Sequence, residues 1–290
     1  MKKVLVTGAN GALARVLITR LGQIDRYQVV GASRRPAATG EVQLDLRDKD
    51  QIASTVKQVE PDLVFHLAAT FANDFDEAYA VNVEAARHLL EAVQGAGRPI
   101  RVVLIGSAAE YGVVQPDENP LREDRVLKPV SVYGLTKSWQ TSLASLYAGR
   151  GVDVVVARVF NLDGPGLSDR LFVGRLQSQI NDVKAGRKSA IELGPLDAVR
   201  DYVETGVAAE QILAIATCGA TGEVFHVASG VPVSMRDLLK KYLAEHHLDE
   251  SIVKAAPILS NRTGYDVPVI YADMTRTNQL MNEWRTGVKA

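Results

Sequence analysis

The residues of this chain whose spacing suggests chemistry are Tyr133 and Lys137, in Tyr133-Gly-Leu-Thr-Lys137, and Ser107, which ends an apolar stretch 26 residues earlier. On a helix, positions i and i+4 share one face, so the Tyr133 phenol and the Lys137 ammonium are expected side by side. A nearby cation favours the phenolate, so we expect the pKa of Tyr133 to fall from its ordinary value of about 10 toward working pH. Tyr133 could then exchange a proton at a carbon that changes between alcohol and ketone, with Ser107 holding the same oxygen.

A glycine-rich turn after the first predicted strand supports this interpretation, because Tyr-x-x-x-Lys alone is common on surface helices. Val4–Val6 form a short apolar strand, and Gly8 and Gly11 follow it directly. These glycines allow a tight turn and close approach of the backbone to a pyrophosphate, which the amides of a helix over residues 11–21 would bind. Ala14 replaces the third glycine of the usual fingerprint by the smallest side chain. Strand, glycine turn and helix in this order predict a dinucleotide site.

The turn after the second predicted strand bears on which dinucleotide binds. Gln28–Ala32 ends in Ser33-Arg34-Arg35, with no Asp or Glu. A carboxylate there would bind the ribose 2′-hydroxyl of NAD and repel the 2′-phosphate of NADP, whereas an arginine accommodates that phosphate. The sequence therefore predicts that NADP(H) is preferred and NAD(H) is possible. The alternative is an ordinary solvated basic turn.

Asp45 and Leu46 follow a third short apolar stretch, residues 42–44. We expect this pair to contact the adenine edge of the cofactor. An aspartate at this place could equally cap the helix that starts near Asp48.

Short apolar strands alternate with helical patterns through about residue 160. This alternation predicts an α/β fold with a doubly wound parallel sheet, and ligands should bind at the carboxyl ends of the strands. After Gly164-Pro165-Gly166 the pattern becomes less regular. We therefore expect a cofactor-binding Rossmann domain over 1–160, with returning elements at about 195–230, and a smaller, irregular α/β substrate-binding lobe over most of 161–290. The predicted strands are Val4–Val6, Val29–Ala32, Val42–Leu44, Leu63–Leu67, Val102–Ile105 and Val154–Ala157.

Composition excludes several other classes of protein. The 290 residues carry a formal net charge of −1, so no basic surface for nucleic acid or for a membrane is expected. A single cysteine, Cys218, excludes a disulfide scaffold, and the five histidines show no metal-ligand spacing. No apolar run reaches the length of a membrane span and no signal peptide is visible. A cytoplasmic protein without a metal site is expected.

Taken together, the motifs resemble those of the extended short-chain dehydrogenase/reductase family, the NAD-dependent epimerase/dehydratases. Within it, Ile105-Gly106-Ser107 through Gly112 and the segment from Leu196 to Tyr202 are most similar to the GDP-4-keto-6-deoxy-mannose reductases. The matching stretches run almost from end to end: Thr7-Gly8-x-x-Gly11, Phe65-His66-Leu67-Ala68-Ala69, Val81-Asn82-Val83, Ser107-x-x-x-Tyr111-Gly112, Tyr133-x-x-x-Lys137, Arg158-Val-Phe-Asn161 with Gly164-Pro165-Gly166, and Arg200-Asp201-Tyr202.

The resemblance implies roles for the site. Tyr133, Lys137 and Ser107 would be catalytic in hydride transfer at a sugar C4, with Lys137 also holding the nicotinamide ribose. Arg200 is the best candidate for the substrate diphosphate because a guanidinium matches phosphate oxygens; Arg262 is second, in a segment whose spacing departs from the family. The remaining expected contacts are Thr70, Ser107 and Asn161 for the substrate, and Gly8, Asn10, Gly11, Ala12, Ser33, Arg34, Arg35, Asp45, Leu46, Leu67, Ala68, Ala69, Tyr133 and Lys137 for the cofactor.

The implied activity is NADPH-dependent reduction of the 4-keto group of a nucleotide-diphosphate 4-keto-6-deoxy sugar. A 4,6-dehydratase is disfavoured, because the positions after Ser107 that carry its acid–base pair are Ala108 and Ala109, and Glu110 would project differently from an extended segment. A 4-epimerase with bound NAD shares the same three catalytic residues and remains an alternative. A second alternative is a nucleotide sensor without turnover, although a sensor has no need for a proton donor.

The resemblance also implies a homodimer, in which the helix after Asn82 and the helix that carries Tyr133 pair with their symmetry mates. Both segments contain enough apolar residues to cover the sheet and a partner at once. The alternative is that all of them face the protein's own sheet. The residues concerned are Leu89, Leu90, Val93, Trp139, Leu143 and Leu146.

Overall fold

A computed structural model describes residues 1–35, 40–255 and 267–287 of the chain. Its largest element is a seven-stranded sheet in the order β10-β6-β5-β4-β1-β2-β3, in which every neighbouring pair is parallel. The strands are rich in β-branched residues and buried on both faces, as parallel sheets require. They are β1 Lys2–Thr7, β2 Tyr27–Ser33, β3 Val42–Gln43, β4 Leu63–His66, β5 Arg101–Ser107, β6 Asp153–Val159 and β10 Val224–Val227.

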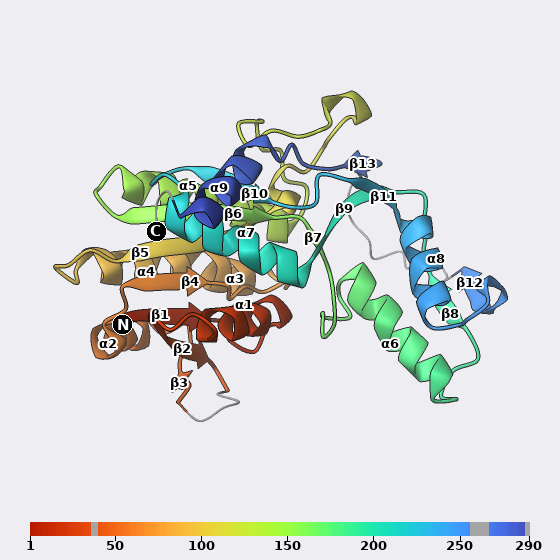
Figure 1. Cartoon of the computed structure of the whole chain (residues 1–290), viewed down its shortest axis with the longest axis horizontal. Coiled ribbons are helices and arrows are strands. Elements are labelled where there is room, and N and C mark those ends of the chain that lie inside the picture. The colour runs from red at the N-terminus through yellow and green to blue at the C-terminus, as the bar shows by residue number, and fades with distance from the viewer. Residues whose placement is uncertain (36–39, 256–266, 288–290) are drawn as a thin grey trace.

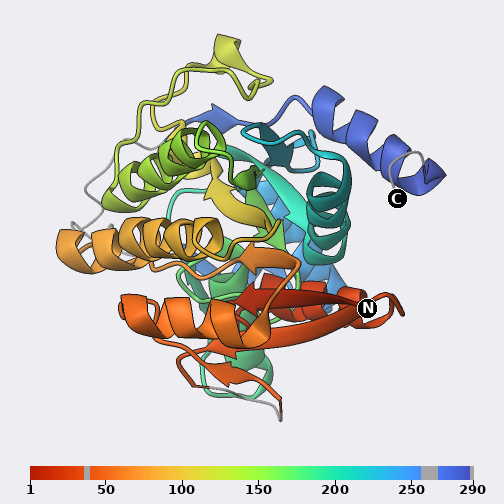
Figure 2. The same ribbon diagram turned by 90° about the vertical axis from the view of Figure 1, so that its left-hand side faces the viewer.

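Helices cover both faces of this sheet (Figure 1). One apolar core lies under α1 (Ala12–Gly22), α7 (Thr205–Cys218) and α9 (Thr275–Thr286). The core on the opposite face lies under α2 (Lys49–Val59), α4 (Ala85–Gln94) and α5 (Val132–Ala148). Figure 2 shows these two helical layers with the sheet between them. The short helix α3 (Phe75–Tyr79) leads through a π-helical turn, Ala80–Glu84, into α4.

A smaller lobe lies beyond the carboxyl ends of the strands, on the right in Figure 1. Its own apolar core joins α6 (Phe172–Lys184) and α8 (Met235–Glu245) to β8 (Ile191–Leu193) and β12 (Val253–Ala255), which pair with each other. A second sheet connects the lobe to the rest of the molecule; it contains β7 (Asn161–Asp163), β9 (Val199–Glu204), β11 (Pro232–Ser234) and β13 (Val269–Ile270).

The predicted fold class is therefore confirmed: a doubly wound parallel sheet with a smaller, irregular lobe. Each of the six predicted strands is present, with ends that differ by at most two residues. The helix after the glycine turn begins at Ala12 and ends at Gly22, close to the predicted 11–21. Within the described part of the chain, no helix combines the length and the apolar character that crossing a bilayer demands.

Candidate active site

A cavity of about 610 Å³ opens where β1, β4, β5 and β6 end. Gly8 follows β1, Leu67 follows β4, Ser107 ends β5 and Phe160 follows β6, and all four line this cavity. The main residues predicted from sequence thus meet at one edge of the sheet, as the parallel arrangement requires. A second cavity of similar size adjoins it, because Gly8, Gly11, Leu67 and Ala69 line both.

The glycine turn has the shape that a dinucleotide needs. Gly8 has a φ of +70°, and a Cβ at this position would lie 2.8 Å from the backbone of Ala68, so only glycine fits. Gly11 donates its N–H to the Gly8 carbonyl at 2.9 Å and is the N-cap of α1, which has no side-chain cap. Because no side chain caps them, the first backbone N–H groups of α1 are available to a ligand in the cavity. These residues fit the pyrophosphate of a nicotinamide dinucleotide.

The second cavity fits the adenosine half of such a cofactor. Asn10 donates from Nδ2 to the Ser33 hydroxyl at 3.1 Å and to the Arg35 carbonyl at 2.7 Å, which holds the turn after β2 against the glycine loop. Arg34 and Arg35 are both exposed at the rim. The predicted cofactor residues that line this cavity are Gly8, Asn10, Gly11, Ser33, Arg34, Arg35, Asp45, Leu46, Leu67, Ala68 and Ala69; Ala12 lines the first cavity.

Asp45 is held by a third arginine that sequence reasoning missed. Arg47 binds both carboxylate oxygens of Asp45, the shortest contact being 2.6 Å, and together with nearby Arg34 it lowers the pKa of Asp45 to about 2. Asp48, and not Asp45, is the N-cap of α2, accepting from the amides of residues 50 and 51. Asp45 is therefore available to the cavity as a charged group.

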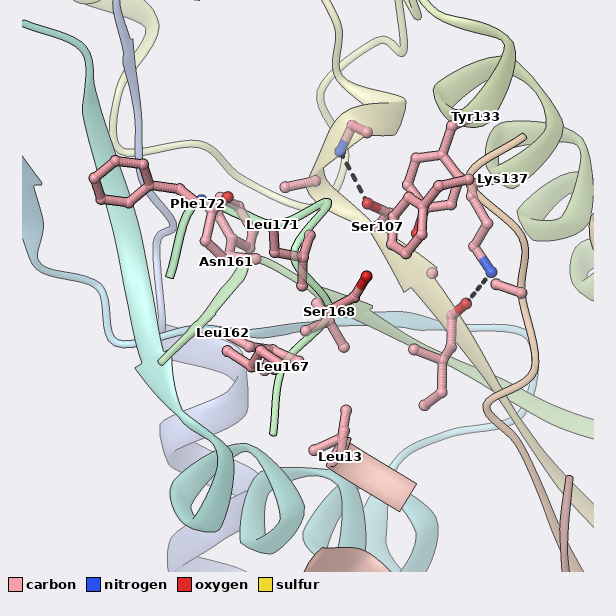
Figure 3. A pocket seen from close by; sticks show the side chains of 18 of the residues that line it. Leu13, Ser107, Tyr133, Lys137, Asn161, Leu162, Leu167, Ser168, Leu171 and Phe172 are labelled. Carbon is pink, nitrogen blue, oxygen red and sulfur yellow. Dashed lines mark hydrogen bonds between the residues drawn. The ribbon is translucent and has the colours of Figure 1, made fainter. Parts of the chain in front are cut away.

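Ser107 and Tyr133 lie together on one wall of the first cavity (Figure 3). The Ser107 hydroxyl accepts from the Ala109 amide at 3.2 Å, and Ser107 lies near enough to the Tyr133 phenol to lower its pKa. Phe71 packs on the Tyr133 ring with a centroid separation of 4.5 Å. Phe71 thus holds the ring in place, and the Ser107 side chain lies on the same wall as the phenol.

The expected lowering of the Tyr133 pKa by Lys137 is wrong for this arrangement. Burial raises the pKa of Tyr133 to about 12, and the interaction with Ser107 opposes that shift only in part. The physical reason is where Lys137 directs its charge. Its ammonium donates to the Ile105 carbonyl on β5 and to Gln140 Oε1 one turn along the helix. Tyr133 therefore stays protonated at neutral pH in this geometry, which is the state of a proton donor.

Lys137 is itself almost fully buried. Loss of hydration lowers the pKa of its ammonium to about 8, against an opposing effect of the Glu110 carboxylate. Gln140, which is also buried, donates to the same Ile105 carbonyl at 3.2 Å. The lysine is thus a titratable cation whose position is set by the end of β5.

Buried hydrogen bonds fix the catalytic helix α5 against its neighbours. Ser131 caps the helix by accepting from the Gly134 amide at 3.0 Å. Asn82, fully buried in the π-helical turn, donates to the Thr136 hydroxyl at 3.0 Å. The same Asn82 amide accepts from the Thr70 N–H at 2.9 Å and donates to the Thr70 carbonyl at 3.1 Å. Asn82 thereby ties the loop after β4 to the helix that carries Tyr133 and Lys137.

The facing wall of the cavity is mainly apolar. It is made by the segment after β6 and by the start of α6, which lie opposite the catalytic residues in Figure 3. Asn161 and Ser168 are its polar side chains, and Asn161 donates to the Asp201 carbonyl at 3.1 Å. Arg200 also lines the cavity and donates to the carbonyls of Val199 and Val267 at 2.9 and 2.5 Å. The apolar side chains of this wall are Leu162, Leu167, Leu171 and Phe172.

The expected substrate residues are not all brought together. Ser107, Asn161 and Arg200 line the first cavity, whereas Thr70 lines the second. Arg262 lies outside the described residues.

Sequence reasoning missed the role of Asp201, although it noted Arg200-Asp201-Tyr202. Asp201 is fully buried and accepts from the amides of Ser229 and Gly230 at 2.7 and 2.9 Å, from the Ser229 hydroxyl, and from the Ala272 amide at 3.2 Å. It therefore joins β9 to the segment after β10 and to the segment after β13. No local signal in the sequence marks this role, because the partners of Asp201 lie 28 to 71 residues away.

The segment after Ser107 is not extended, contrary to the expectation. Ala108–Glu110 form a 3₁₀ turn, because Ser107 and Glu110 cap it reciprocally: Ser107 accepts from Ala109, and Glu110 accepts from the Ser107 amide at 2.6 Å. Glu110 is fully buried and does not line the cavity. No carboxylic acid from this turn is therefore presented to a substrate.

Comparison of this chain with known proteins agrees with the geometry of the site. A family model described as the NAD dependent epimerase/dehydratase family matches residues 4–228. The chain belongs to this family, which confirms the predicted extended short-chain dehydrogenase/reductase and the prediction of an enzyme.

Three relatives illustrate the range within the family. A GDP-6-deoxy-D-talose 4-dehydrogenase from Aggregatibacter actinomycetemcomitans is 28% identical over 99% of this chain and 95% of its own length. A GDP-6-deoxy-D-mannose reductase from Pseudomonas aeruginosa is 27% identical over 82% of this chain and 78% of its own. The solved structure of MoeE5 in complex with UDP-glucose and NAD superposes with a TM-score of 0.82 at 29% identity, covering 97% of this chain and 92% of that one.

Proposed function

We propose that this protein reduces the 4-keto group of a nucleotide-diphosphate 4-keto-6-deoxy sugar with NADPH, as a GDP-4-keto-6-deoxy-mannose reductase does. The observation that carries the proposal is the placement of Ser107, Tyr133 and Lys137 on one wall of a cavity continuous with the glycine turn. Two relatives whose names describe redox chemistry of GDP-6-deoxy sugars, one of them specifically at C4, support the substrate class.

The chain's own residues provide the proton chemistry. A bound nicotinamide would supply the hydride. Tyr133, protonated because its pKa is raised to about 12, is placed to give its proton to the oxygen that develops at C4. The Ser107 hydroxyl, on the same wall of the cavity as Tyr133, is placed to hold the same oxygen. Lys137, charged below its pKa of about 8, is the cation nearest to this proton transfer on the same helix.

The cofactor preference is inferred from charge at the second cavity. Arg34 and Arg35 follow β2 where an NAD site carries a carboxylate, and Arg47 adds a third guanidinium. The Asp45 carboxylate is paired with Arg47, so it opposes a 2′-phosphate less than a lone carboxylate would. NADP(H) is the favoured cofactor for these reasons.

A 4-epimerase with bound NAD is the second candidate, because MoeE5, at 29% identity, was solved with a UDP-sugar and NAD. A turnover screen of GDP-, UDP-, dTDP- and CDP-sugars, in their 4-keto-6-deoxy and parent forms, separates the two. A reductase consumes one NADPH for each 4-keto sugar, measured by loss of nicotinamide absorbance. An epimerase interconverts parent sugars with catalytic NAD and no net consumption. Interconversion without NADPH use would overturn the reductase proposal.

We also propose a homodimer, through a surface formed by Phe75, Tyr79 and Trp139. Both rings of α3 contact Trp139 on α5 edge-on with centroids 5.9 Å apart, yet the three side chains are 43, 37 and 37% exposed. Leu146, two turns along α5, is 48% exposed. An apolar surface of this kind is typical of a protein–protein contact.

Part of the expected interface faces inward instead. Leu89, Leu90 and Val93 are buried in the protein's own core, because α4 packs them against the sheet. Sedimentation at micromolar concentration should give the mass of two chains, and Trp139→Glu should give the mass of one. A single-chain mass for the parent protein would refute the dimer.

A further inference from the structure

Glu110 is a buried carboxylate that touches three elements of the candidate active site. Its Oε1 accepts from the Ser107 amide at 2.6 Å, at the end of β5. Its Oε2 accepts from the Thr141 hydroxyl at 2.8 Å, on α5, and from two nitrogens of Arg158 on β6 at 2.9 and 3.2 Å. Ser107 lies on the first of these elements, and Tyr133 and Lys137 lie on the second.

The chain makes specific room for this carboxylate. A Cβ on Gly106 would lie 2.7 Å from Glu110 Oε1, so a side chain there would displace it. A Cβ on Gly134 would lie 2.4 Å from the Ala109 carbonyl, so the first turn of α5 packs directly on the same 3₁₀ turn. Glycines on both sides allow the turn after Ser107 to pack closely between strand and helix.

Arg158 neutralises Glu110 and continues into a buried polar network. Arg158 donates to the Tyr111 hydroxyl at 2.9 Å, and that hydroxyl lies 2.5 Å from His226 Nε2. Burial lowers the pKa of His226 to about 4, so this imidazole is neutral at pH 7. Glu123, whose carbonyl accepts from Arg158 at 3.3 Å, has its pKa raised by burial. Glu110 and Arg158 form a buried ion pair, 2.9 Å apart, directly beneath the site.

We propose that Glu110 is a positioning residue for the reaction: its carboxylate fixes the Ser107 turn against the helix of Tyr133 and Lys137, and its charge sets the field in which they transfer protons. The inference rests on the proposed function for its kinetic consequences. The contacts of Glu110 and its effect on the Tyr133 pKa are properties of the protein alone, and they can be measured without a substrate.

The charge of Glu110 acts on both catalytic groups in the same direction. It raises the pKa of Tyr133 and that of Lys137, in the second case against the effect of burial. His66 on β4 also interacts with Lys137, but burial lowers the pKa of His66 to about 3, so it carries no charge at neutral pH. Removal of the Glu110 charge should therefore lower both catalytic pKa values and move the alkaline limb of activity to lower pH.

Three variants separate the charge of Glu110 from its contacts. Glu110→Gln keeps an acceptor for the Ser107 amide but leaves Arg158 without its counter-ion, which can unfold a protein. The double variant Glu110→Gln with Arg158→Met removes both charges and keeps the volume and the Ser107 contact. Thr141→Val removes only the contact with α5. Asp153→Asn is the matched control, because Asp153 pairs with Arg101 at 2.5 Å at the opposite end of β5.

The first measurement needs no substrate. The absorbance titration of tyrosinate, taken as the difference between each protein and the same protein with Tyr133→Phe, isolates Tyr133. In Glu110→Gln its midpoint should fall by about half a pH unit or more; in the double variant, where the opposing Arg158 charge is also lost, it should fall less, and in Asp153→Asn it should not move. In kinetics with the 4-keto sugar and NADPH, the alkaline limb of kcat/KM should move the same way. Thr141→Val should lower kcat by about threefold or more without moving that limb.

Two results would overturn the inference. One is a folded Glu110→Gln variant with the Tyr133 titration of the parent protein. The other, decisive if that variant fails to fold, is Thr141→Val with the kcat of the parent. A wrong proposed function would give a different result. The parent protein would then turn over no 4-keto sugar, while the shift in the tyrosinate titration would persist.

Discussion

The two walls of the candidate active site are built on different principles. The catalytic wall, formed by β5 and α5, is polar, buried and cross-linked: Lys137 bonds the Ile105 carbonyl on β5, and Glu110 bonds both elements. The facing wall is mostly apolar, with Asn161 and Ser168 as its polar side chains (Figure 3). The difference teaches that chemistry is fixed where buried polar groups constrain each other, while substrate identity depends on a wall defined mainly by shape, with few polar side chains.

The strongest test of the catalytic wall is Tyr133→Phe. This change removes the proposed proton donor and keeps the ring that packs on Phe71, so kcat should fall by about 10² or more while NADPH affinity is unchanged. Steady-state kinetics and a binding titration measure the two quantities. Near-normal turnover of the true substrate would show that the proton comes from elsewhere.

The lowered pKa of Lys137 predicts how the activity of the catalytic wall depends on pH. Because its pKa is lowered to about 8, the ammonium is charged below that pH and neutral above it. If the charged form is required, kcat/KM should be level on the acid side and fall about tenfold per pH unit above about pH 8. Lys137→Met should lower both turnover and cofactor affinity. A profile that stays level well above pH 9 in the parent protein would contradict a role for the Lys137 charge.

The sequence was sufficient for the fold and for the cofactor edge because those signals are local. The central strands are mostly apolar runs, and Gly8 sits where backbone geometry allows nothing larger. The direction of the Lys137 side chain was not predictable in this way. It depends on Ile105 and Gln140, which meet the ammonium only when α5 packs on the end of β5. The spacing of Tyr133 and Lys137 therefore predicted neighbours correctly and their electrostatic coupling wrongly.

Glu110 and Asp201 show the same limit. Their partners lie 48 and 71 residues away at the farthest, Arg158 and Ala272, so no local pattern announces them. The apolar facing wall is a further case, since Leu162 and Leu171 are unremarkable in sequence and meet only around the cavity.

A substitution at the cofactor-binding edge should have a smaller effect than one in the catalytic wall. Arg34→Ala removes one cation from the rim of the second cavity and should weaken NADPH by about tenfold while leaving NADH nearly unchanged. Arg26→Ala is the control, because it removes the same charge next to the opposite end of β2. Dissociation constants for both dinucleotides decide the matter. Equal or tighter binding of NADH by the parent protein would refute the NADP(H) preference.

The facing wall should give the smallest effect, and of a different kind. Leu171 is the N-cap of α6 through its backbone alone, so Leu171→Ala shortens the wall without removing a side-chain cap. Because the apolar Leu171 side chain only shapes the cavity, KM for the sugar should rise by about three- to tenfold while kcat stays within about twofold. Val126→Ala, at a side chain 70% exposed and not among the cavity-lining residues, should change neither constant. A fall in kcat comparable to that of Tyr133→Phe would mean that the apolar wall orients the reacting carbon, and the contrast between the two walls would fail.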